Sequence, residues 1–170
     1  FNYFSVKANP NYSNTMNKPR ILFISHNANY GGATIQLVNL LRQQSREDVW
    51  EVVVLLKQSG PLEATFSALC PTYVIQHGQV IGLSSPTKAG YDNLKAFYSA
   101  IRPDVVYANT ILAARFLKVA HMLHIPVILH VRESVINFHR QMADFAHELL
   151  TCDHYVCSSD GIKAYLEGDI

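Results

Sequence analysis

Short apolar runs that alternate with amphipathic runs constrain the fold of this chain more than any other feature of its sequence. The strand-like runs lie at 20–25, 50–56, 72–76, 104–108, 126–131 and 153–158. Several are apolar throughout, as expected for parallel strands that are covered on both faces. The alternation therefore predicts an α/β fold with a doubly wound, Rossmann-like parallel sheet of about six strands. We expect the strand order 3-2-1-4-5-6, in which the first and fourth strands are neighbours.

Helix-like stretches fill the intervals between these strands. Their apolar residues recur with the 3.6-residue period of an amphipathic helix. The stripes are Ala33, Leu37 and Leu41; Tyr91, Leu94, Phe97, Tyr98 and Ile101; Leu112, Phe116, Val119, Ala120 and Leu123; and Phe138, Met142, Phe145, Ala146 and Leu149. Such stripes are more often core than cofactor contacts. Functional residues are expected instead beyond the carboxyl ends of the strands, where ligands bind in open parallel sheets.

Composition narrows the class of protein. Of the 170 residues, 49% are hydrophobic and 16% are charged, which suits a globular domain. The formal net charge of +1 shows no basic excess, so we predict no nucleic-acid partner. The sequence has no signal-peptide pattern and no apolar run of membrane-spanning length. Its 3 cysteines are interpreted as buried thiols in a reducing compartment, and a cytoplasmic location is predicted.

A glycine pair follows the first predicted strand. The loop after Ser25 leads to Gly31 and Gly32, which open the first predicted helix. This loop matches neither the GxGxxG fingerprint nor a P-loop, because the third glycine and the Gly-Lys-Ser/Thr sequence are missing. Two explanations stay open. A glycine can permit a positive φ in the turn, or the bare backbone can let an anion approach the free amides of the helix.

Polar residues also follow the fourth and fifth predicted strands. Asn109 comes after the fourth strand, where it either caps the next helix or faces a ligand. His130, Arg132 and Glu133 close a strand that is otherwise apolar, and burying such groups is costly unless something uses them. His130 and Arg132 are expected on one face of the strand. We expect these residues and the glycine pair to surround one cleft, because the loops emerge at one sheet edge.

Two further polar groups have structural explanations. His121 and His124 lie one helical turn apart, but they fall near the end of a helix and far from that sheet edge. A solvated helix face is favoured over a metal site, and no metal ligands are predicted. A serine of the pair 158–159 is predicted to cap the last helix.

Three segments, in their order and spacing, carry a resemblance to a known family. They are ILFISHNANYGGATIQLVNLL, PDVVYANTILAARFLKVAHMLHIPVILHVRES and CDHYVCSSDGIKAYL. Together they resemble the N-terminal half of a glycosyltransferase of the GT-B fold, and they are most similar to family 4, the large retaining group. The resemblance covers residues 20–167.

The resemblance implies two Rossmann-like domains that face each other across a cleft. The N-terminal domain holds the acceptor, and the C-terminal domain holds the nucleotide-sugar donor. Gly31, Gly32 and Asn109 then become candidates for binding a phosphate or the acceptor. Many relatives end the fifth strand with His followed by Asp or Glu, whereas the aligned pair here is Arg132 and Glu133.

A histidine, His130, lies two positions before Arg132, so His130, Arg132 and Glu133 are the candidate catalytic residues. Arg132 suits a phosphate or carboxylate through its planar fork. Residues 1–18 are predicted to be an extended leader and residues 19–170 the Rossmann-like domain. The donor domain is expected to lie outside this chain, which by itself is expected to be inactive.

The predicted function is retaining transfer, of the hexosyltransferase type, from a nucleotide-diphosphate sugar to a saccharide or lipid-linked acceptor in polysaccharide biosynthesis. No cofactor and no metal are expected, and peripheral membrane association of the longer enzyme stays open. The alternative is a non-catalytic Rossmann-like module that binds a ligand or a partner protein. A nicotinamide oxidoreductase is disfavoured because the glycine fingerprint is missing.

Overall fold

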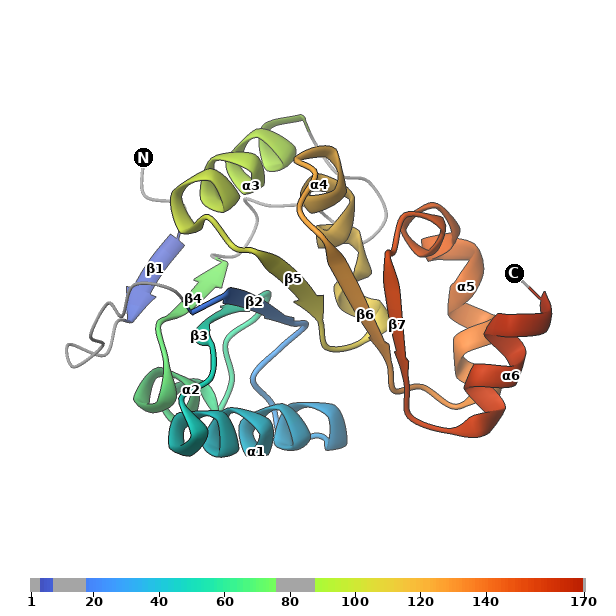
Figure 1. Ribbon diagram of the computed structural model, residues 1–170, viewed down its shortest axis with the longest axis horizontal. Coiled ribbons are helices and arrows are strands. Elements are labelled where there is room, and N and C mark those ends of the chain that lie inside the picture. Colours follow the sequence, from blue (N-terminus) through green and yellow to red (C-terminus); the bar gives the residue numbers. More distant parts are fainter. Residues whose placement is uncertain (1–3, 8–17, 76–87, 170) are drawn as a thin grey trace.

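A parallel sheet flanked by helices forms the centre of the computed structural model, which describes residues 4–7, 18–75 and 88–169 (Figure 1). Its parallel strands are β2 (Arg20–Ser25), β3 (Glu51–Leu56), β4 (Thr72–Ile75), β5 (Val105–Ala108), β6 (Val127–Val131) and β7 (His154–Cys157). They lie in the order β4-β3-β2-β5-β6-β7. This order matches the predicted 3-2-1-4-5-6, so the doubly wound Rossmann-like fold is confirmed. The first and fourth predicted strands, β2 and β5, are paired in parallel.

A further strand, β1 (Phe4–Lys7), was not among the predicted six. It pairs antiparallel with β4 at the edge of the sheet, with Phe4 opposite Ile75 and Lys7 opposite Thr72. A strand of 4 residues at an edge is held by its backbone pairing and carries too short a pattern to detect. Most of the predicted leader lies outside the described residues, as does Gln76 at the predicted end of the third strand.

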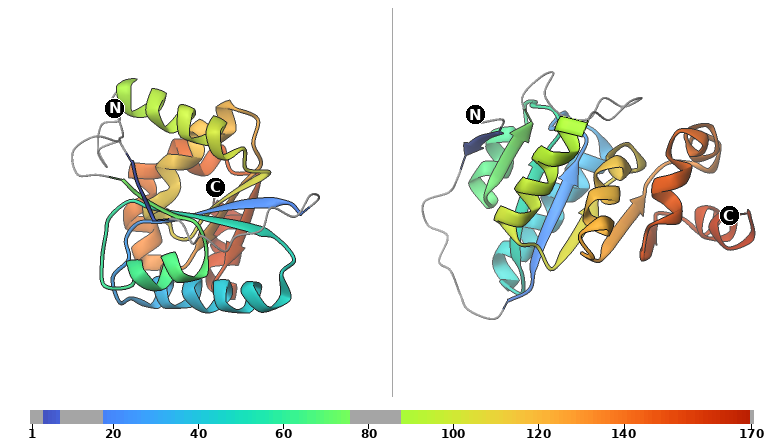
Figure 2. Two further views of the ribbon diagram at one scale, coloured as in Figure 1. Left: turned by 90° about the vertical axis from the view of Figure 1, so that its left-hand side faces the viewer. Right: turned by 90° about the horizontal axis from the view of Figure 1, so that it is seen from above.

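Helices cover both faces of the sheet (Figures 1 and 2). They are α1 (Gly32–Glu47), α2 (Glu63–Leu69), α3 (Lys88–Ile101), the 3-10 helix η1 (Ile111–Phe116), α4 (Leu117–Met122), α5 (Val135–Leu150) and α6 (Asp160–Asp169). One hydrophobic cluster joins α1 and α2 to the sheet, and another joins α3, η1, α4 and α5 to the opposite face. The third predicted stripe is divided between η1 and α4. No stripe predicted α2, because its 7 residues bury only Phe66 and show no period.

The two halves of the sheet are covered differently. All positions of β3 are buried, since helices pack on both of its faces. In β6, Val127, Leu129 and Val131 are fully buried, whereas Ile128 and His130 are half-buried on the opposite face. The residues of β7 alternate between exposed and half-buried. The described helices therefore cover β6 and β7 well on one face only.

The structure tests the predicted burial of the three cysteine thiols and the predicted absence of a membrane span. Cys70 is buried, while Cys152 and Cys157 are half-buried, and all three thiols are free. Burial raises the pKa of Cys70 and of Cys152 to about 12, so both stay protonated at neutral pH. The prediction of buried thiols thus holds fully for Cys70 alone. Among the described residues, no helix has both the length and the apolar character that a membrane span requires.

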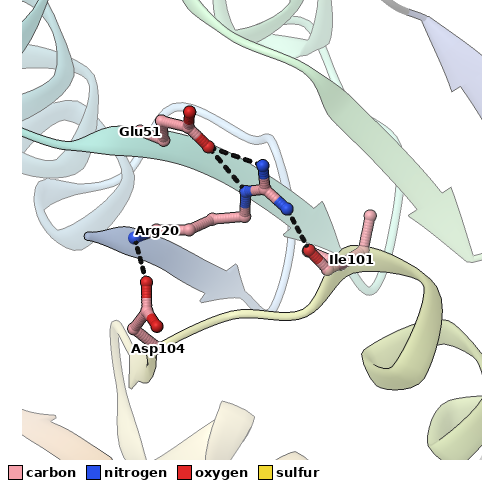
Figure 3. A network of polar contacts seen from close by, with 4 residues as sticks. All are labelled: Arg20, Glu51, Ile101 and Asp104. Carbon is pink, nitrogen blue, oxygen red and sulfur yellow. Dashed lines mark hydrogen bonds and ion pairs between the residues drawn. The ribbon is translucent and has the colours of Figure 1, made fainter. Parts of the chain in front are cut away.

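An ion pair at the amino ends of the strands ties β2, β3 and α3 together (Figure 3). Arg20 Nε donates to Glu51 Oε2 at 2.8 Å, and Nη2 lies 2.6 Å from the same oxygen. Arg20 Nη1 donates to the carbonyl of Ile101 at the end of α3 (2.6 Å), and its backbone N–H donates to Asp104 (2.7 Å). A cavity of about 410 Å³ adjoins the pair. The amino ends of the strands lie opposite to the carboxyl ends, at which the ligand-binding loops are predicted.

Arg20→Met should lower the free energy of unfolding by about 2 kcal/mol, because the Glu51 carboxylate would keep a nearly buried charge without its partner. The side chain of Glu51 is only 10% exposed. Arg20→Met combined with Glu51→Gln should cost less than the sum of the two single changes, since no unpaired charge then remains. Urea unfolding at pH 7 measures all three variants. Strictly additive losses would show that the two side chains act independently.

Candidate functional site

Asn109 lies at the centre of the polar contacts beyond the carboxyl ends of the strands. Its side chain is fully buried at the end of β5. Its Nδ2 donates to the carbonyl of Ala33 in the first turn of α1 (3.0 Å), and its backbone N–H donates to Ile24 on β2 (2.9 Å). Asn109 therefore joins β5 to the start of α1. The alternative that it caps the next helix is wrong, because Thr110 is the N-cap of η1 and forms no side-chain cap.

Arg132 is fixed against Asn109 and α1. Its Nε donates to both the backbone carbonyl and the Oδ1 of Asn109, each at 3.1 Å. Its Nη1 donates to the side chain of Gln36, which is one turn along α1 from the glycine pair. Burial lowers the pKa of Arg132, while the neighbouring Tyr107 and Glu133 raise it. The guanidinium thus stands as a half-buried, oriented positive charge beside the start of α1.

Glu133 is bound by backbone amides in this structure. Its Oε2 accepts the N–H of Arg132 (2.9 Å), and its Oε1 accepts the N–H of Ile111 (3.3 Å). Burial raises the pKa of Glu133, and the bonds from backbone N–H groups and the charge of Arg132 oppose that rise. The carboxylate therefore connects the loop after β6 to the first residue of η1, where it holds both segments in place.

His130 faces the sheet rather than the first turn of α1. Its Nδ1 lies 2.5 Å from the hydroxyl of Tyr107 on the neighbouring strand, with the two rings edge to face. Burial, and secondly the charge of Arg132, lower the pKa of His130 to about 4. Burial raises the pKa of Tyr107, so its hydroxyl stays protonated and can donate to the neutral imidazole. As predicted, His130 and Arg132 lie on one side of the sheet, opposite to the buried Val131.

The glycine pair is exposed and does not adopt a strained backbone. Gly31 has φ −159° and ψ 155°, an extended conformation that any residue can adopt, and Gly32 begins α1. A Cβ atom added at either glycine would meet nothing within 4 Å. The explanation by a positive φ is therefore wrong for both residues. The N-cap residue Gly31 offers no side-chain cap, no acidic residue lies in the first turn of α1, and the space beside both glycines is open.

Three residues of this region escaped sequence analysis. Gln36 contacts Arg132, and its position 4 residues after Gly32 on the helix was the signal available for it. Tyr107 contacts His130 across two paired strands, which only the sheet order reveals. Gly60 lies in the loop after β3, where an added Cβ would approach the carbonyl carbon and oxygen of Ala28 to 2.6 Å. The close backbone contact explains a glycine at that position.

The remaining polar predictions concern helix ends and metals. Ser159 Oγ accepts the N–H of Ile162 (3.3 Å), so the predicted serine cap of α6 is confirmed. His121 is exposed on α4, as expected for a solvated helix face, whereas His124 is exposed but lies in the turn after α4, which ends at Met122. Within the described part of the chain, no group of three or more His, Cys, Asp or Glu side chains is arranged to hold a metal ion.

Asn109 joins Arg132 to Ala33, which directly follows Gly31 and Gly32, and Glu133 accepts the N–H of Arg132. His130 lies on the same side of the sheet, but its contact is with Tyr107. Two cavities among the described residues, of about 410 and 170 Å³, lie elsewhere, and a shared cleft around the six predicted residues stays a prediction.

Gly32→Ala and Gly60→Ala should separate an open glycine from a packed one. Gly32→Ala should change the free energy of unfolding by less than about 0.5 kcal/mol, because its Cβ meets no atom. Gly60→Ala should cost about 1–3 kcal/mol, because the Ala28 backbone must move. Chemical unfolding of the two variants measures the difference. Equal losses would contradict the open surroundings of Gly32.

His130 should stay neutral well below the usual range of histidine. NMR titration of its imidazole should give a pKa of about 4, against the ordinary 6.5. Arg132→Met should raise this pKa, because a neighbouring positive charge is removed. The folded protein binds fewer protons than the unfolded chain between these values, so His130 should reduce stability as the pH falls from 6.5 to about 4. A His130 pKa near 6.5 in the wild-type chain would contradict this burial.

Comparisons with known proteins found likeness in structure alone. No family model matches the chain, and no curated protein matches it. HepE from Anabaena, solved with UDP and glucose, is 19% identical, with a TM-score of 0.62 over 88% of this chain and 41% of that chain. A protein from Listeria monocytogenes assigned as a UDP-N-acetylglucosamine 2-epimerase is 12% identical, with a TM-score of 0.64 over 91% and 43%.

Sucrose-phosphate synthase from Thermosynechococcus elongatus is 17% identical, with a TM-score of 0.56 over 88% of this chain and 45% of that chain. The chain thus spans less than half the length of each of these three proteins. At such low identities the likeness shows the fold. This chain has the Rossmann-like architecture found in glycosyltransferases of the GT-B fold.

Proposed function

We propose that this chain is the acceptor-side domain of a retaining glycosyltransferase with the GT-B fold, of the family 4 type. The parent enzyme would transfer a sugar, as a hexosyltransferase does, from a nucleotide-diphosphate sugar to a hydroxyl of a saccharide or lipid-linked acceptor. The observation that carries this proposal is the start of α1. Its backbone amides are uncapped by side chains, its glycines are open, and Arg132 is fixed beside them.

The start of α1 suits the negative charge that develops on a leaving diphosphate. A helix of 16 residues carries a partial positive charge at its N-terminus, where its first N–H groups have no partner within the helix. An oxyanion can bind such a terminus directly. Since a Cβ at Gly31 or Gly32 would project into open space, the two glycines leave the approach to these amides free.

Arg132 adds a full positive charge that is already oriented. Its bonds to Asn109 and Gln36 fix the guanidinium before any ligand arrives, so little side-chain entropy is lost on binding. Stabilisation of developing charge by groups oriented in advance is a large part of enzymatic catalysis. With the helix start and Arg132 as sources of positive charge, the proposal requires neither a metal nor a cofactor.

The two other candidate residues, Glu133 and His130, would position Arg132 and orient the sugar. Glu133 holds the loop after β6 against η1 and thereby keeps Arg132 in place. His130 is neutral at physiological pH, so it can hydrogen-bond to a sugar hydroxyl but cannot supply a positive charge. Since the hydroxyl of Tyr107 lies against Nδ1, Nε2 is the nitrogen available to a substrate.

The comparisons support this choice among the functions that the fold can host. HepE was solved with UDP and glucose, and sucrose-phosphate synthase also shares the fold. An assigned epimerase shares it as well, so architecture alone does not select transfer. The share of those proteins that this chain leaves uncovered supports a second, donor-binding domain. We place the parent enzyme in cytoplasmic polysaccharide synthesis, with its membrane association an open part of the proposal.

Gly32→Val and Arg132→Lys, made in the two-domain protein, should each reduce sugar transfer at least about tenfold, or 1.4 kcal/mol of barrier. Valine blocks close approach to the helix amides, and lysine keeps the charge but loses the planar fork. Release of the nucleotide from the sugar donor in the presence of acceptor measures the rate. The thermal midpoint should change little for either variant.

Gly168→Val and Arg42→Lys are matched controls, because Gly168 is also in open space and Arg42 is exposed on α1. Both should keep full activity. The 170-residue chain alone should show no turnover above the enzyme-free background. If the two-domain protein binds a nucleotide sugar but never transfers it, the non-catalytic binding module becomes the better assignment.

A further inference from the structure

Three basic side chains gather at the carboxyl edge of the sheet, on the face that η1 covers. They are His26 in the loop after β2, Lys57 directly after β3, and Arg115 within η1. The even-numbered residues of β2 and the odd-numbered residues of β3 pack in the cluster that contains η1, and His26 and Lys57 continue these two rows. The N–H of Lys57 donates to the carbonyl of Ser25 (2.9 Å), which places the two loops side by side.

His26 and Arg115 are positioned by contacts with other residues. His26 Nδ1 lies 3.3 Å from Thr110 Oγ1, immediately before η1. Arg115 Nη2 donates to the carbonyl of Asp144 (3.1 Å), and its Cζ lies over the Phe145 ring at 5.1 Å from the centroid. The Nε of Arg115 is buried and has no hydrogen-bond partner among the described residues. Arg115 is therefore fixed while part of its hydrogen-bonding capacity is unused.

Each basic group of this set disfavours the charged form of its neighbour. Burial lowers the pKa of Lys57, and the charge of Arg115 lowers it further. Burial likewise lowers the pKa of His26, with Lys57 as the second cause. All three side chains are half-buried, so water screens them only in part. Such an arrangement is unfavourable by itself and becomes favourable when an anion joins it.

The acidic residues Glu63 and Glu133 make other contacts in the structure. Glu63 on α2 accepts a hydrogen bond from the Ser59 hydroxyl (2.5 Å), and Glu133 is bound by backbone amides. Within the described residues, none of the ion pairs involves His26, Lys57 or Arg115. The stretches outside the described part contain no Asp or Glu in their sequence. An anionic ligand would balance the charge of this group.

We propose that His26, Lys57 and Arg115 form a subsite for a phosphate group carried by one of the sugar substrates. The cations Lys57 and Arg115, together with the imidazole of His26 as a third hydrogen-bonding group, suit the several oxygens and the double negative charge of a phosphate. Two consecutive residues link the subsite to Arg132: Asn109 accepts a hydrogen bond from Arg132, and Thr110 contacts His26. The proposal rests on the proposed function to identify the molecule that carries the phosphate. That molecule is an acceptor with a phosphate monoester or the donor with its diphosphate.

Titration of the 170-residue chain with inorganic phosphate tests the subsite, with sodium chloride at equal ionic strength as the reference. The imidazole signal of His26 should shift saturably in NMR spectra, and its pKa should rise. Lys57→Met and Arg115→Gln should each weaken this binding at least about tenfold, equivalent to 1.4 kcal/mol. Lys57→Arg keeps the charge and should retain binding. Lys163→Met and Arg42→Gln, both at exposed positions, are the controls and should change nothing.

A competition experiment identifies which substrate, the acceptor or the donor, carries the bound phosphate. Displacement of phosphate from His26 by glucose 6-phosphate, but not by UDP, assigns the subsite to the acceptor, and the reverse assigns it to the donor. Displacement by neither would overturn the link to a sugar substrate. Phosphate that shifts only the amides of Gly31 and Gly32, with His26 unmoved, overturns the subsite and leaves the proposed function standing. No saturable shift at all overturns the subsite as well.

Discussion

The parallel pairing of β2 with β5 decides where every loop of the candidate site lies. β2 is flanked by β3 on one side and β5 on the other, so the crossovers that follow β2 and β5 run to opposite faces of the sheet. Where crossovers diverge, the carboxyl ends of the strands stay accessible, and ligands of open α/β sheets bind there. The glycine pair and Asn109 follow the two strands concerned. Their meeting is a consequence of strand order.

The buried side-chain amide of Asn109 fixes the start of α1 and Arg132 relative to each other. The side chain of Asn109 has no exposed surface, so its donor and acceptor must be satisfied within the protein. Its donor holds Ala33 at the start of α1, and its acceptor holds Arg132. One residue therefore fixes both the helix terminus and the guanidinium. A polar group that is costly to bury unpaired determines here where two sources of positive charge stand relative to each other.

The distribution of charge over the two sheet edges matters more than its sum. The net charge is only +1, yet basic groups gather at the carboxyl edge in two sets, Arg132 on one face and His26, Lys57 and Arg115 on the other. Acidic groups such as Glu51 lie at the opposite edge, where Glu51 is paired with Arg20. A chain that is nearly neutral overall can thus still collect basic groups at one end of its strands.

Local pattern in the sequence determined the elements of this protein. Apolar runs and 3.6-residue stripes predicted six parallel strands, their order and four helical stretches, because burial on one or both faces imposes those periods on any chain that folds this way. The short elements β1 and α2 escaped, since 4 and 7 residues hold too little pattern to distinguish them from loops. The cap at Ser159 followed from chemistry within one helical turn, which sequence records directly.

The tertiary structure alone decided what the polar residues at the strand ends do. Asn109 was equally suited to cap a helix, and only its burial against Ala33 and Arg132 settles its role. The same holds for the backbone bonds of Glu133. The pairing of His130 with Tyr107 depends on which strands are neighbours. Contacts between residues far apart in the chain are set by packing, and a single sequence carries no local signal of its distant partners.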